Sequence, residues 1–249
     1  MFFSQFGEDK ILFEICHRKT SGFCVEVGAN NGIDDSTSLF FENIGWKCIL
    51  VEPNPSLCKE IREKRKALLY ECAASNRTDT KTLYVVEGAA RSDGLSTIST
   101  NQEVHDRIKS HGFVSSPIRV NTMTLDTILT DAQINCDIDF VSIDVEGHEY
   151  EVLEGFSLER WKPLIILVED NSDFESKVVK NYLKRFGYSR FMRTGVNDWY
   201  AHHRNNQLVN IGSSIKLMWL AVRIKTKKRL RRIPIVVQIG KLLRAWGVR

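Results

Sequence analysis

The chain has 249 residues, of which 43% are hydrophobic and 27% are charged, as in a globular protein with one large domain or with a domain and an appendage. This composition excludes a disordered chain, a collagen-like repeat and a minimal disulfide scaffold. The formal net charge of +4 hides an uneven distribution. Residues 199–249 carry 12 of the 35 Lys and Arg and no Asp or Glu, so residues 1–198 have a net charge of −8. An acidic body therefore precedes a strongly basic segment.

Six cysteines are present, without a Cys-x-x-Cys pair and without the Cys/His spacing of a metal site. Cys24 and Cys48 lie in apolar runs, where a free Cys packs as a small hydrophobic residue. We therefore expect reduced thiols and a cytoplasmic location. The N-terminal residues are neither basic nor apolar enough for a signal peptide, and no apolar run reaches the roughly 18 residues of a membrane-spanning helix.

Short apolar runs alternate with amphipathic stretches along most of the chain, which predicts βαβ units and a mainly parallel sheet with helices on both faces. A helix at 5–16 precedes this alternation. The predicted elements that follow, in chain order, are strand 23–27, helix 35–44, strand 47–52, helix 55–66, strand 68–74, strand 139–145, helix 149–155, strand 164–169, helix 174–186, strand 189–193 and strand 198–203. The continuously apolar runs at 47–52 and 164–169 are typical of strands that are buried on both faces.

An insertion interrupts the alternation between residues 80 and 120. It begins with a plausible strand at 81–87 and continues through a stretch rich in Gly, Ser and Thr at 88–100 into a polar segment. Long insertions on an α/β scaffold usually lie over the ligand face. We therefore expect this segment to take part in the choice of substrate.

The basic segment carries apolar residues at near-helical spacing on both sides of Pro234, which predicts two amphipathic basic helices. Three interpretations stay open. It could be a solvated appendage or an oligomer contact. It could attach the protein to an anionic membrane surface, since Lys and Arg near such a surface contribute about 1 kcal/mol each and Trp219 and Trp246 suit the interface. Nucleic-acid binding is unlikely because no recognised motif accompanies the charge.

The first segment with chemical content runs from Glu26 to Gly32, directly after a predicted strand. Glycines at 28 and 32 allow the backbone to approach a ligand or a neighbouring strand closely. The dinucleotide fingerprint Gly-x-Gly-x-x-Gly would require glycine at positions 30 and 33, where this chain has Asn30 and Ile33. A nicotinamide or flavin dinucleotide is therefore disfavoured.

A second feature is Glu52, which ends the next predicted strand 24 residues after Gly28. An acidic side chain at this place can accept hydrogen bonds from the two hydroxyls of a ribose, and a solvated loop glutamate is the alternative. Because the glycine that would approach a pyrophosphate is absent, a nucleoside without pyrophosphate is favoured. S-adenosylmethionine fits this description.

A third feature comes where strand 139–145 delivers Asp144, Glu146 and His148 to the edge of the sheet that holds ligands in open α/β folds. The next strand ends in Glu169-Asp170-Asn171, so oxygen ligands could also converge on Mg²⁺ with Asp144. A metal stays an open alternative, and we assign no metal ligand.

Six blocks of this sequence resemble the FkbM family of S-adenosylmethionine-dependent methyltransferases, in order and spacing. They are SQFGEDKIL (4–12), VEVGANNGIDDS (25–36), ILVEPNP (49–55), ECAASNRTD (71–79), VNTMTLDTIL (120–129) and FVSIDVEGHEYEVLEG (140–155). The resemblance implies a class I methyltransferase fold, which is a Rossmann-like, mostly parallel seven-stranded sheet with a final antiparallel strand, here 198–203, at its edge. It also implies O-methylation of a hydroxyl on a sugar, a polysaccharide or a polyketide-type product.

The resemblance also implies site residues. The positions expected to bind the cofactor are Gln5, Glu26, Gly28, Ala29, Asn30, Gly32, Glu52, Asn54, Cys72, Ala73, Ala74 and Asp144. Among them, Glu52 would bind the ribose and residues 72–74 would line the adenine, while Asp144 would face the acceptor. Ser4, Gln5 and Asp9 match the family's N-terminal block, which would cover the cofactor, and simple helix capping is the alternative.

The expected catalytic residues are His148, Asp144 and Glu146. His148 is the favoured base, because an imidazole accepts a proton near neutral pH. An exposed polar residue at a helix start is the alternative for His148, and either Asp144 or Glu146 could accept the proton instead.

The expected organisation is an N-terminal capping segment (1–20), a methyltransferase domain (21–210) and a basic helical tail (211–249). The expected function is S-adenosylmethionine-dependent O-methylation of a sugar, polysaccharide or glycolipid in the cytoplasm, with peripheral attachment to the inner membrane face as an open alternative. The alternative is a catalytically lapsed domain that acts as a membrane- or nucleic-acid-associated binding module. The intact glycines at 28 and 32, with Glu52 and Asp144, favour an enzyme.

Overall fold

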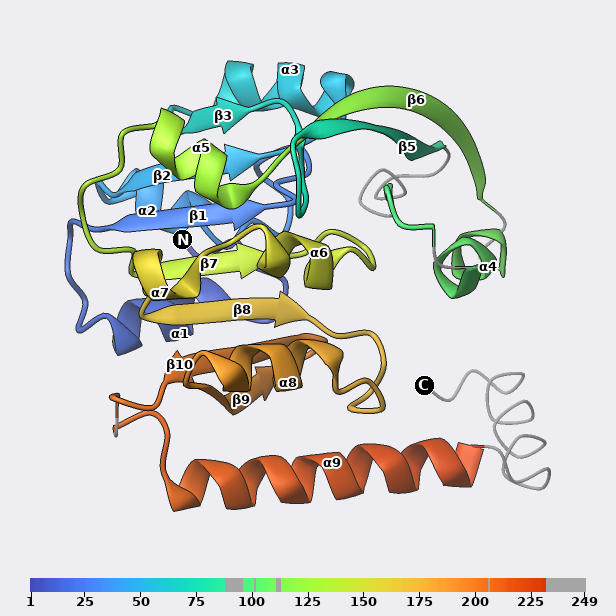
Figure 1. The fold of residues 1–249 in the computed structure, drawn as a ribbon. Coiled ribbons are helices and arrows are strands. Elements are labelled where there is room, and N and C mark those ends of the chain that lie inside the picture. The colour runs from blue at the N-terminus through green and yellow to red at the C-terminus, as the bar shows by residue number, and fades with distance from the viewer. Residues whose placement is uncertain (88–95, 101, 111–112, 206, 232–249) are drawn as a thin grey trace.

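A seven-stranded sheet forms the centre of the computed structural model, which describes residues 1–231 except 88–95, 101, 111–112 and 206 (Figure 1). The strand order is β3-β2-β1-β7-β8-β10-β9, and only β10 runs antiparallel to its neighbours. The strands are β1 (Phe23–Val27), β2 (Lys47–Val51), β3 (Leu68–Tyr70), β7 (Phe140–Ile143), β8 (Ile165–Glu169), β9 (Tyr188–Thr194) and β10 (Asn197–His202). The predicted seven-stranded, mostly parallel sheet is confirmed. The antiparallel strand was predicted at the edge of the sheet, but β10 lies between β8 and β9, and β9 forms the edge.

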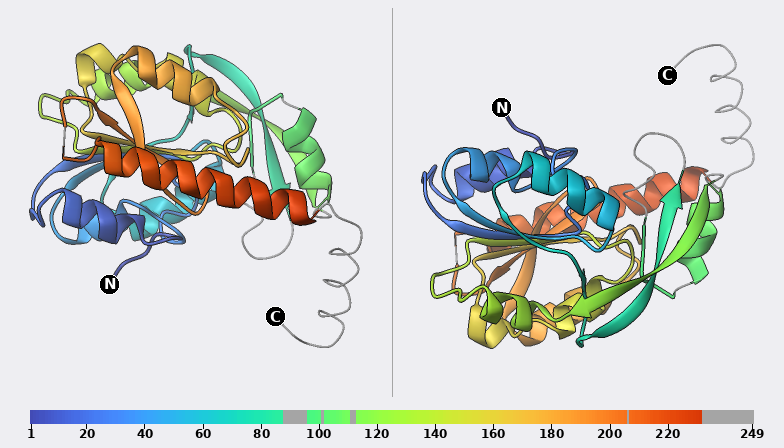
Figure 2. Two further views of the ribbon diagram at one scale, coloured as in Figure 1. Left: turned by 90° about the horizontal axis from the view of Figure 1, so that it is seen from below. Right: turned by 90° about the horizontal axis from the view of Figure 1, so that it is seen from above.

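Helices cover both faces of this sheet (Figure 2). One face holds α1 (Glu8–Ile15), α2 (Leu39–Asn43) and α3 (Pro55–Lys64). The other face holds α5 (Leu125–Asp131), α6 (Glu149–Glu154), α7 (Leu158–Trp161) and α8 (Val178–Arg185). The predicted helices are present with shorter bounds, whereas α5 and α7 were not predicted. Both are short, which leaves little periodicity to detect in the sequence.

Alternating side chains of the central strands build two apolar layers. Val141 and Ile166 pack on the face of α5 and α6, while Phe140 and Leu167 pack on the face of α1 and α2. All five residues of β1 are buried, as expected for a central strand of a parallel sheet. These strands therefore present their carboxyl ends, rather than their faces, to solvent.

The predicted strand at 68–74 is wrong in one respect, because the chain changes sheets within it. β3 ends at Tyr70, and Ala73–Ala74 forms β4 in a second sheet of order β4-β6-β5. β4 pairs with the end of β6 (Val114–Met123), which runs antiparallel to β5 (Asp79–Glu87). The insertion therefore forms a two-stranded arm with α4 (Gln102–Ser110) near its tip, beyond the carboxyl ends of the main strands (Figure 1).

The last described element is the 21-residue helix α9 (Ile211–Arg231), which packs beside β9 at the edge of the sheet (Figures 1 and 2). The helix predicted beyond Pro234 lies outside the described residues. In the part of the chain that is described, α9 included, no helix has both the length and the apolar character needed to cross a membrane. The domain limits at residues 20 and 210 stay predictions.

Two buried charged side chains, Glu26 and Arg65, fix the irregular segment between β1 and α2. The Glu26 carboxylate accepts hydrogen bonds from Ser36 Oγ (2.8 Å) and Thr37 N (2.6 Å). The Arg65 guanidinium, whose side chain is fully buried, donates to Ser38 Oγ (2.8 Å) and pairs with Glu42 (3.0 Å). These contacts hold residues 36–38 before the helix, which begins at Leu39, four residues later than predicted.

Replacing Arg65 by Met should destabilise the protein by roughly 3–5 kcal/mol, because it leaves Glu42 and several buried polar groups without their cation. Urea unfolding monitored by circular dichroism measures this change. Arg18→Met is the matched control, since Arg18 forms a solvent-exposed pair with Glu14 and its loss should leave the free energy of unfolding almost unchanged. Equal stability of the two variants would contradict the structural role of Arg65.

Candidate active site

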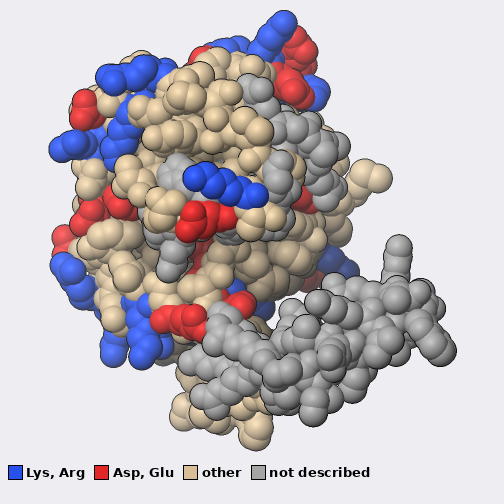
Figure 3. All heavy atoms as spheres, turned by 90° about the vertical axis from the view of Figure 1, so that its right-hand side faces the viewer, with Lys and Arg blue, Asp and Glu red and all other residues tan. Residues whose placement is uncertain are grey.

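Three adjoining hollows open at the carboxyl ends of the parallel strands. Figure 3 views this face, where acidic side chains gather near the middle and many Lys and Arg lie toward the margin. We name the hollows by one lining residue each: the Glu52 pocket (about 50 Å³), the Glu26 pocket (about 240 Å³) and the His148 cleft (about 950 Å³). The two pockets share Gly28, Asn30, Asp144 and Glu146, and the Glu26 pocket shares Glu169 with the cleft. They therefore form one continuous site.

The turn after β1 separates the two pockets and is pressed against the end of β7. Gly28 has a φ of +82°, and a Cβ at this position would lie 1.7 Å from the carbonyl oxygen of Asp144. Gly28 is therefore required by the close approach of two backbones. Gly32 lies on the α3 side of the turn, where a Cβ would approach Ile61 to 3.0 Å.

Glu52 is buried at the end of β2, with 5% of its surface exposed. One carboxylate oxygen accepts the N–H of Asn30 and the other accepts the N–H of Asn54, both at 2.9 Å. Burial raises the pKa of Glu52 to about 7, against the opposing effect of these two hydrogen bonds. Each oxygen retains a lone pair, so the carboxylate can accept further hydrogen bonds from a ligand.

The remaining wall of the Glu52 pocket is apolar. Leu57, Leu83 and Ile98 line it together with the predicted residues Cys72, Ala73 and Ala74. Asn54, another predicted residue, begins α3 and accepts the N–H of Ser56 through its side chain. This pocket therefore suits a ligand with a flat apolar ring, which would lie beside the buried carboxylate of Glu52.

The Glu26 pocket is lined by Asp144, Glu146 and Glu169, whose carboxylate oxygens lie within 4.8 Å of one another. The Asp144 side chain opens into the pocket. Burial, with the nearby charges of Glu146 and Glu149, holds the pKa of Asp144 well above its ordinary value, while a hydrogen bond with Glu169 partly opposes this shift. The raised pKa favours the protonated form of Asp144.

This cluster favours a cationic ligand, which can be a metal ion or an organic cation. Neither pocket has a Lys or Arg among the described residues that line it. Two of the residues considered for Mg²⁺ differ in their surroundings. Glu169 lies with Asp144 in this cluster. The Asp170 carboxylate instead accepts a hydrogen bond from Ser172 N at 2.9 Å and forms an ion pair with Arg193 at 3.2 Å. The lack of described basic side chains disfavours a phosphate-bearing ligand.

The N-terminal segment forms the far wall of the Glu26 pocket. Gln5 and Glu8 line it, and Ser4 bridges to Asp35. The fully buried Asp9 accepts hydrogen bonds from Ser4 Oγ (2.7 Å) and Ser4 N (3.3 Å), so it shapes the turn before α1. Glu8, which was not predicted, accepts hydrogen bonds from Thr194 Oγ1 and Asn197 Nδ2 and so fastens this segment to β9 and β10.

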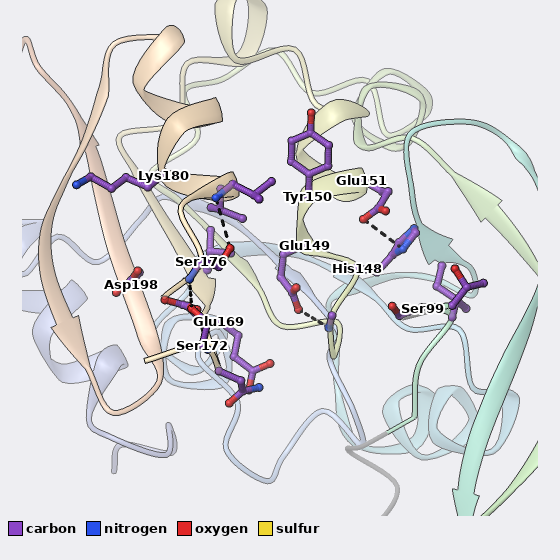
Figure 4. A pocket seen from close by; sticks show the side chains of 18 of the residues that line it. Ser99, His148, Glu149, Tyr150, Glu151, Glu169, Ser172, Ser176, Lys180 and Asp198 are labelled. Carbon is purple, nitrogen blue, oxygen red and sulfur yellow. Dashed lines mark hydrogen bonds and ion pairs between the residues drawn. The ribbon is translucent and has the colours of Figure 1, made fainter. Parts of the chain in front are cut away.

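His148 lies in the wall of the cleft with 4% of its surface exposed (Figure 4). Its Nε2 is 3.0 Å from Ser75 Oγ and 3.3 Å from Lys81 Nζ, and its Nδ1 is 3.4 Å from a carboxylate oxygen of Glu151. Burial and the charge of Lys81 lower the pKa of His148 to about 4. Because an ammonium group only donates, the neutral ring accepts at Nε2 and carries its proton on Nδ1, toward Glu151.

The cleft is lined by both polar and apolar side chains. Figure 4 shows His148, Glu149 and Tyr150 on one side and Lys180, Ser172 and Asp198 on the other. The insertion supplies Lys81, Tyr84 and Ser99 to the lining. Lys81 was not predicted, because its position beside His148 depends on a contact between residues 67 apart in the sequence.

Taken together, the topology and the site define an α/β domain with a candidate ligand site at the carboxyl ends of a doubly wound sheet. The profile of the Methyltransferase FkbM domain matches residues 26–190. The chain therefore belongs to the FkbM methyltransferase family, as its sequence motifs indicate.

Two solved structures show a more distant likeness. The methyltransferase FkbM from Methylobacillus flagellatus KT is 14% identical with a TM-score of 0.47, over 74% of this chain and 44% of its own length. The precorrin-6y C5,15-methyltransferase from Geobacter metallireducens GS-15 is 15% identical with a TM-score of 0.39, over 77% and 84%. This chain thus spans less than half the length of the first protein. No curated protein matches the sequence.

Proposed function

We propose that this protein transfers a methyl group from S-adenosylmethionine to a hydroxyl of a sugar, polysaccharide or glycolipid. The observation that carries the proposal is the combination of a buried Glu52 beside an apolar pocket with an acidic pocket next to it. A nucleoside with a positively charged substituent matches both halves. Membership of the FkbM methyltransferase family supports the same cofactor.

The residues of the two pockets fit this cofactor. The ribose hydroxyls would donate to the free lone pairs of Glu52, and the adenine would lie among Leu57, Leu83 and residues 72–74. The sulfonium and the ammonium of the methionine part would lie among the carboxylates of the Glu26 pocket, next to Gln5. Gly28 and Asn30, which line both pockets, would flank the bond between the two parts.

When bound, S-adenosylmethionine supplies a methyl group on a sulfonium, which is a good leaving group. The chain must then hold the acceptor oxygen in line with this methyl and remove its proton. We assign proton removal to Asp144, which opens into the pocket beside the proposed sulfonium position. A positive charge bound nearby favours the ionised form of Asp144, so its raised pKa falls when the site is filled.

His148 fits a supporting role better than that of the base. Its Nε2 lone pair already accepts from Lys81 and Ser75, and its low pKa makes it a weak base. It would instead fix the Lys81 ammonium at the wall of the cleft. Glu146, with a φ of +55° and its carbonyl bound by Thr97 Oγ1 at 2.8 Å, would shape the turn that carries both residues.

The His148 cleft supports a polyhydroxyl acceptor. Its volume of about 950 Å³ is at the upper end of small-molecule sites, and its lining offers hydroxyls, carboxylates and the aromatic side chains of Tyr84, Tyr150 and Tyr200. Sugars are bound by such mixtures of hydrogen-bonding groups and ring faces. Because Glu169 belongs to both cavities, an acceptor in the cleft would lie beside the methyl group.

Isothermal titration calorimetry should show that the full chain binds S-adenosylmethionine and S-adenosylhomocysteine. Glu52→Gln should weaken both by roughly tenfold or more, because two hydroxyls lose a charged acceptor. Wild-type affinity should rise as the pH increases through about 7, where Glu52 ionises, and the variant should lose the part of this dependence that Glu52 contributes. Glu60→Gln, on the exposed side of α3, is the matched control. No binding of either compound would refute the proposal and favour a lapsed binding module.

Asp144→Asn should reduce methylation by roughly 100-fold or more, because the carboxylate that we assign to take the acceptor proton is lost. Mass spectrometry of glycans from the source organism lacking this protein should reveal the missing mass of one methyl group. Complementation by the wild type or by Asp137→Asn, an exposed carboxylate before β7, should restore it. His148→Gln should restore it in part. Full restoration by Asp144→Asn would exclude Asp144 as the base.

A further inference from the structure

The helix α9 carries an apolar face that the rest of the described chain leaves uncovered. The exposed fractions are 80% for Ile211, 47% for Ile215, 57% for Met218, 66% for Trp219 and 52% for Val222. Their spacing of three, four, seven and eight residues places them on one side of the helix. They extend over about 17 Å of helix length at 1.5 Å per residue.

The described part of the chain does not use this face for its own packing. α9 packs on β9, and Leu217, Leu220 and Ile224 on the opposite side of the helix are partly covered. The helix is therefore apolar on two sides, of which one packs on β9 and the other is exposed among the residues that the structure describes. A continuous exposed apolar row of this kind marks an interaction surface.

The charge around the row restricts the partner. No Asp or Glu follows Asp198 in the sequence, and seven Lys or Arg lie between residues 223 and 232. Lys216 and Arg223 are exposed beside the row, on the side of Trp219. An apolar stripe bordered by basic residues and containing Trp is complementary to an anionic lipid surface, with the apolar side chains among the acyl chains and the basic ones near the phosphates.

Other occupants fit less well. A second copy of this chain would bring two strongly basic segments together, and like charges repel at such a contact. A nucleic acid would be drawn by the charge, but it offers little to an exposed row of Ile, Met and Val. We therefore propose that the face formed by Ile211, Ile215, Met218, Trp219 and Val222 docks onto the surface of an anionic membrane.

Figure 1 indicates how the docked protein would be oriented. α9 runs in the direction of β1, β7 and β8, so its C-terminal part lies on the side of the sheet where these strands end. This is also the side of the candidate active site. The docking is independent of the proposed methyl transfer, because no residue of the row lines the pockets or the His148 cleft.

Vesicle co-sedimentation of the full chain tests the proposal. The wild type should sediment with vesicles of phosphatidylcholine and phosphatidylglycerol and not with phosphatidylcholine alone. Replacing Ile215, Met218 and Trp219 together by Ser keeps every basic residue and should reduce the partition coefficient by roughly tenfold or more. Leu68→Ser with Val114→Ser removes exposed apolar side chains elsewhere and is the matched control. Circular dichroism and thermal unfolding verify that both variants fold.

A second measurement places the face in the lipid. Brominated acyl chains should quench the fluorescence of the wild type more than that of Trp219→Phe, which should still bind. Vesicle binding by the triple Ser variant at the wild-type level would overturn the proposal, because charge alone would then suffice. Failure of the wild type to bind anionic vesicles would also overturn the proposal. Light scattering that shows a dimer, or binding of RNA, would then identify a second copy or a nucleic acid as the partner of this face.

Discussion

The site depends on how closely the turn after β1 approaches the end of β7. Gly28 lies so near the Asp144 carbonyl that no side chain fits between the two strands. This contact brings the end of β1, with Glu26, next to Asp144, and the hydrogen bond from Asn30 N to Glu52 adds the end of β2. Three carboxylates from three neighbouring strands thus reach one continuous hollow.

Burying Glu26 and Glu52 costs stability, and the surrounding chain limits that cost in different ways. Glu26 is satisfied by hydroxyl and backbone donors at the start of α2, and Glu52 by two backbone N–H groups. The Asp144 carboxyl opens into the pocket and keeps a raised pKa. A perturbed carboxyl in a cleft is typical of a functional site, and here it lies where a bound cation would stabilise its ionised form. The one described arginine in this region, Arg65, supports the loop from behind.

Much of this arrangement could be predicted from the sequence. The apolar runs of the sequence predict the strands of the main sheet. Gly28, Glu52 and Asp144 lie at the ends of these predicted strands, which identified them as candidate site residues. The division of residues 68–74 between two sheets could not be predicted, because it depends on the pairing of β4 with β6, nearly fifty residues away. The roles of Lys81 and Arg65 could not be predicted for the same reason, since the contacts that give these residues a role join segments that are distant in the sequence. The sequence identified His148 as a candidate site residue. It could not show that Ser75 and Lys81 lie within hydrogen-bonding distance of its Nε2 atom.

The central claim is that the Glu52 and Glu26 pockets together hold one cationic nucleoside. The most direct measurement is a crystal structure of the full chain with S-adenosylmethionine. The account predicts ribose hydroxyls within hydrogen-bonding distance of Glu52, adenine beside residues 72–74, and the sulfonium methyl directed past Asp144 into the His148 cleft. A cofactor bound elsewhere, or one whose ribose does not touch Glu52, would contradict it.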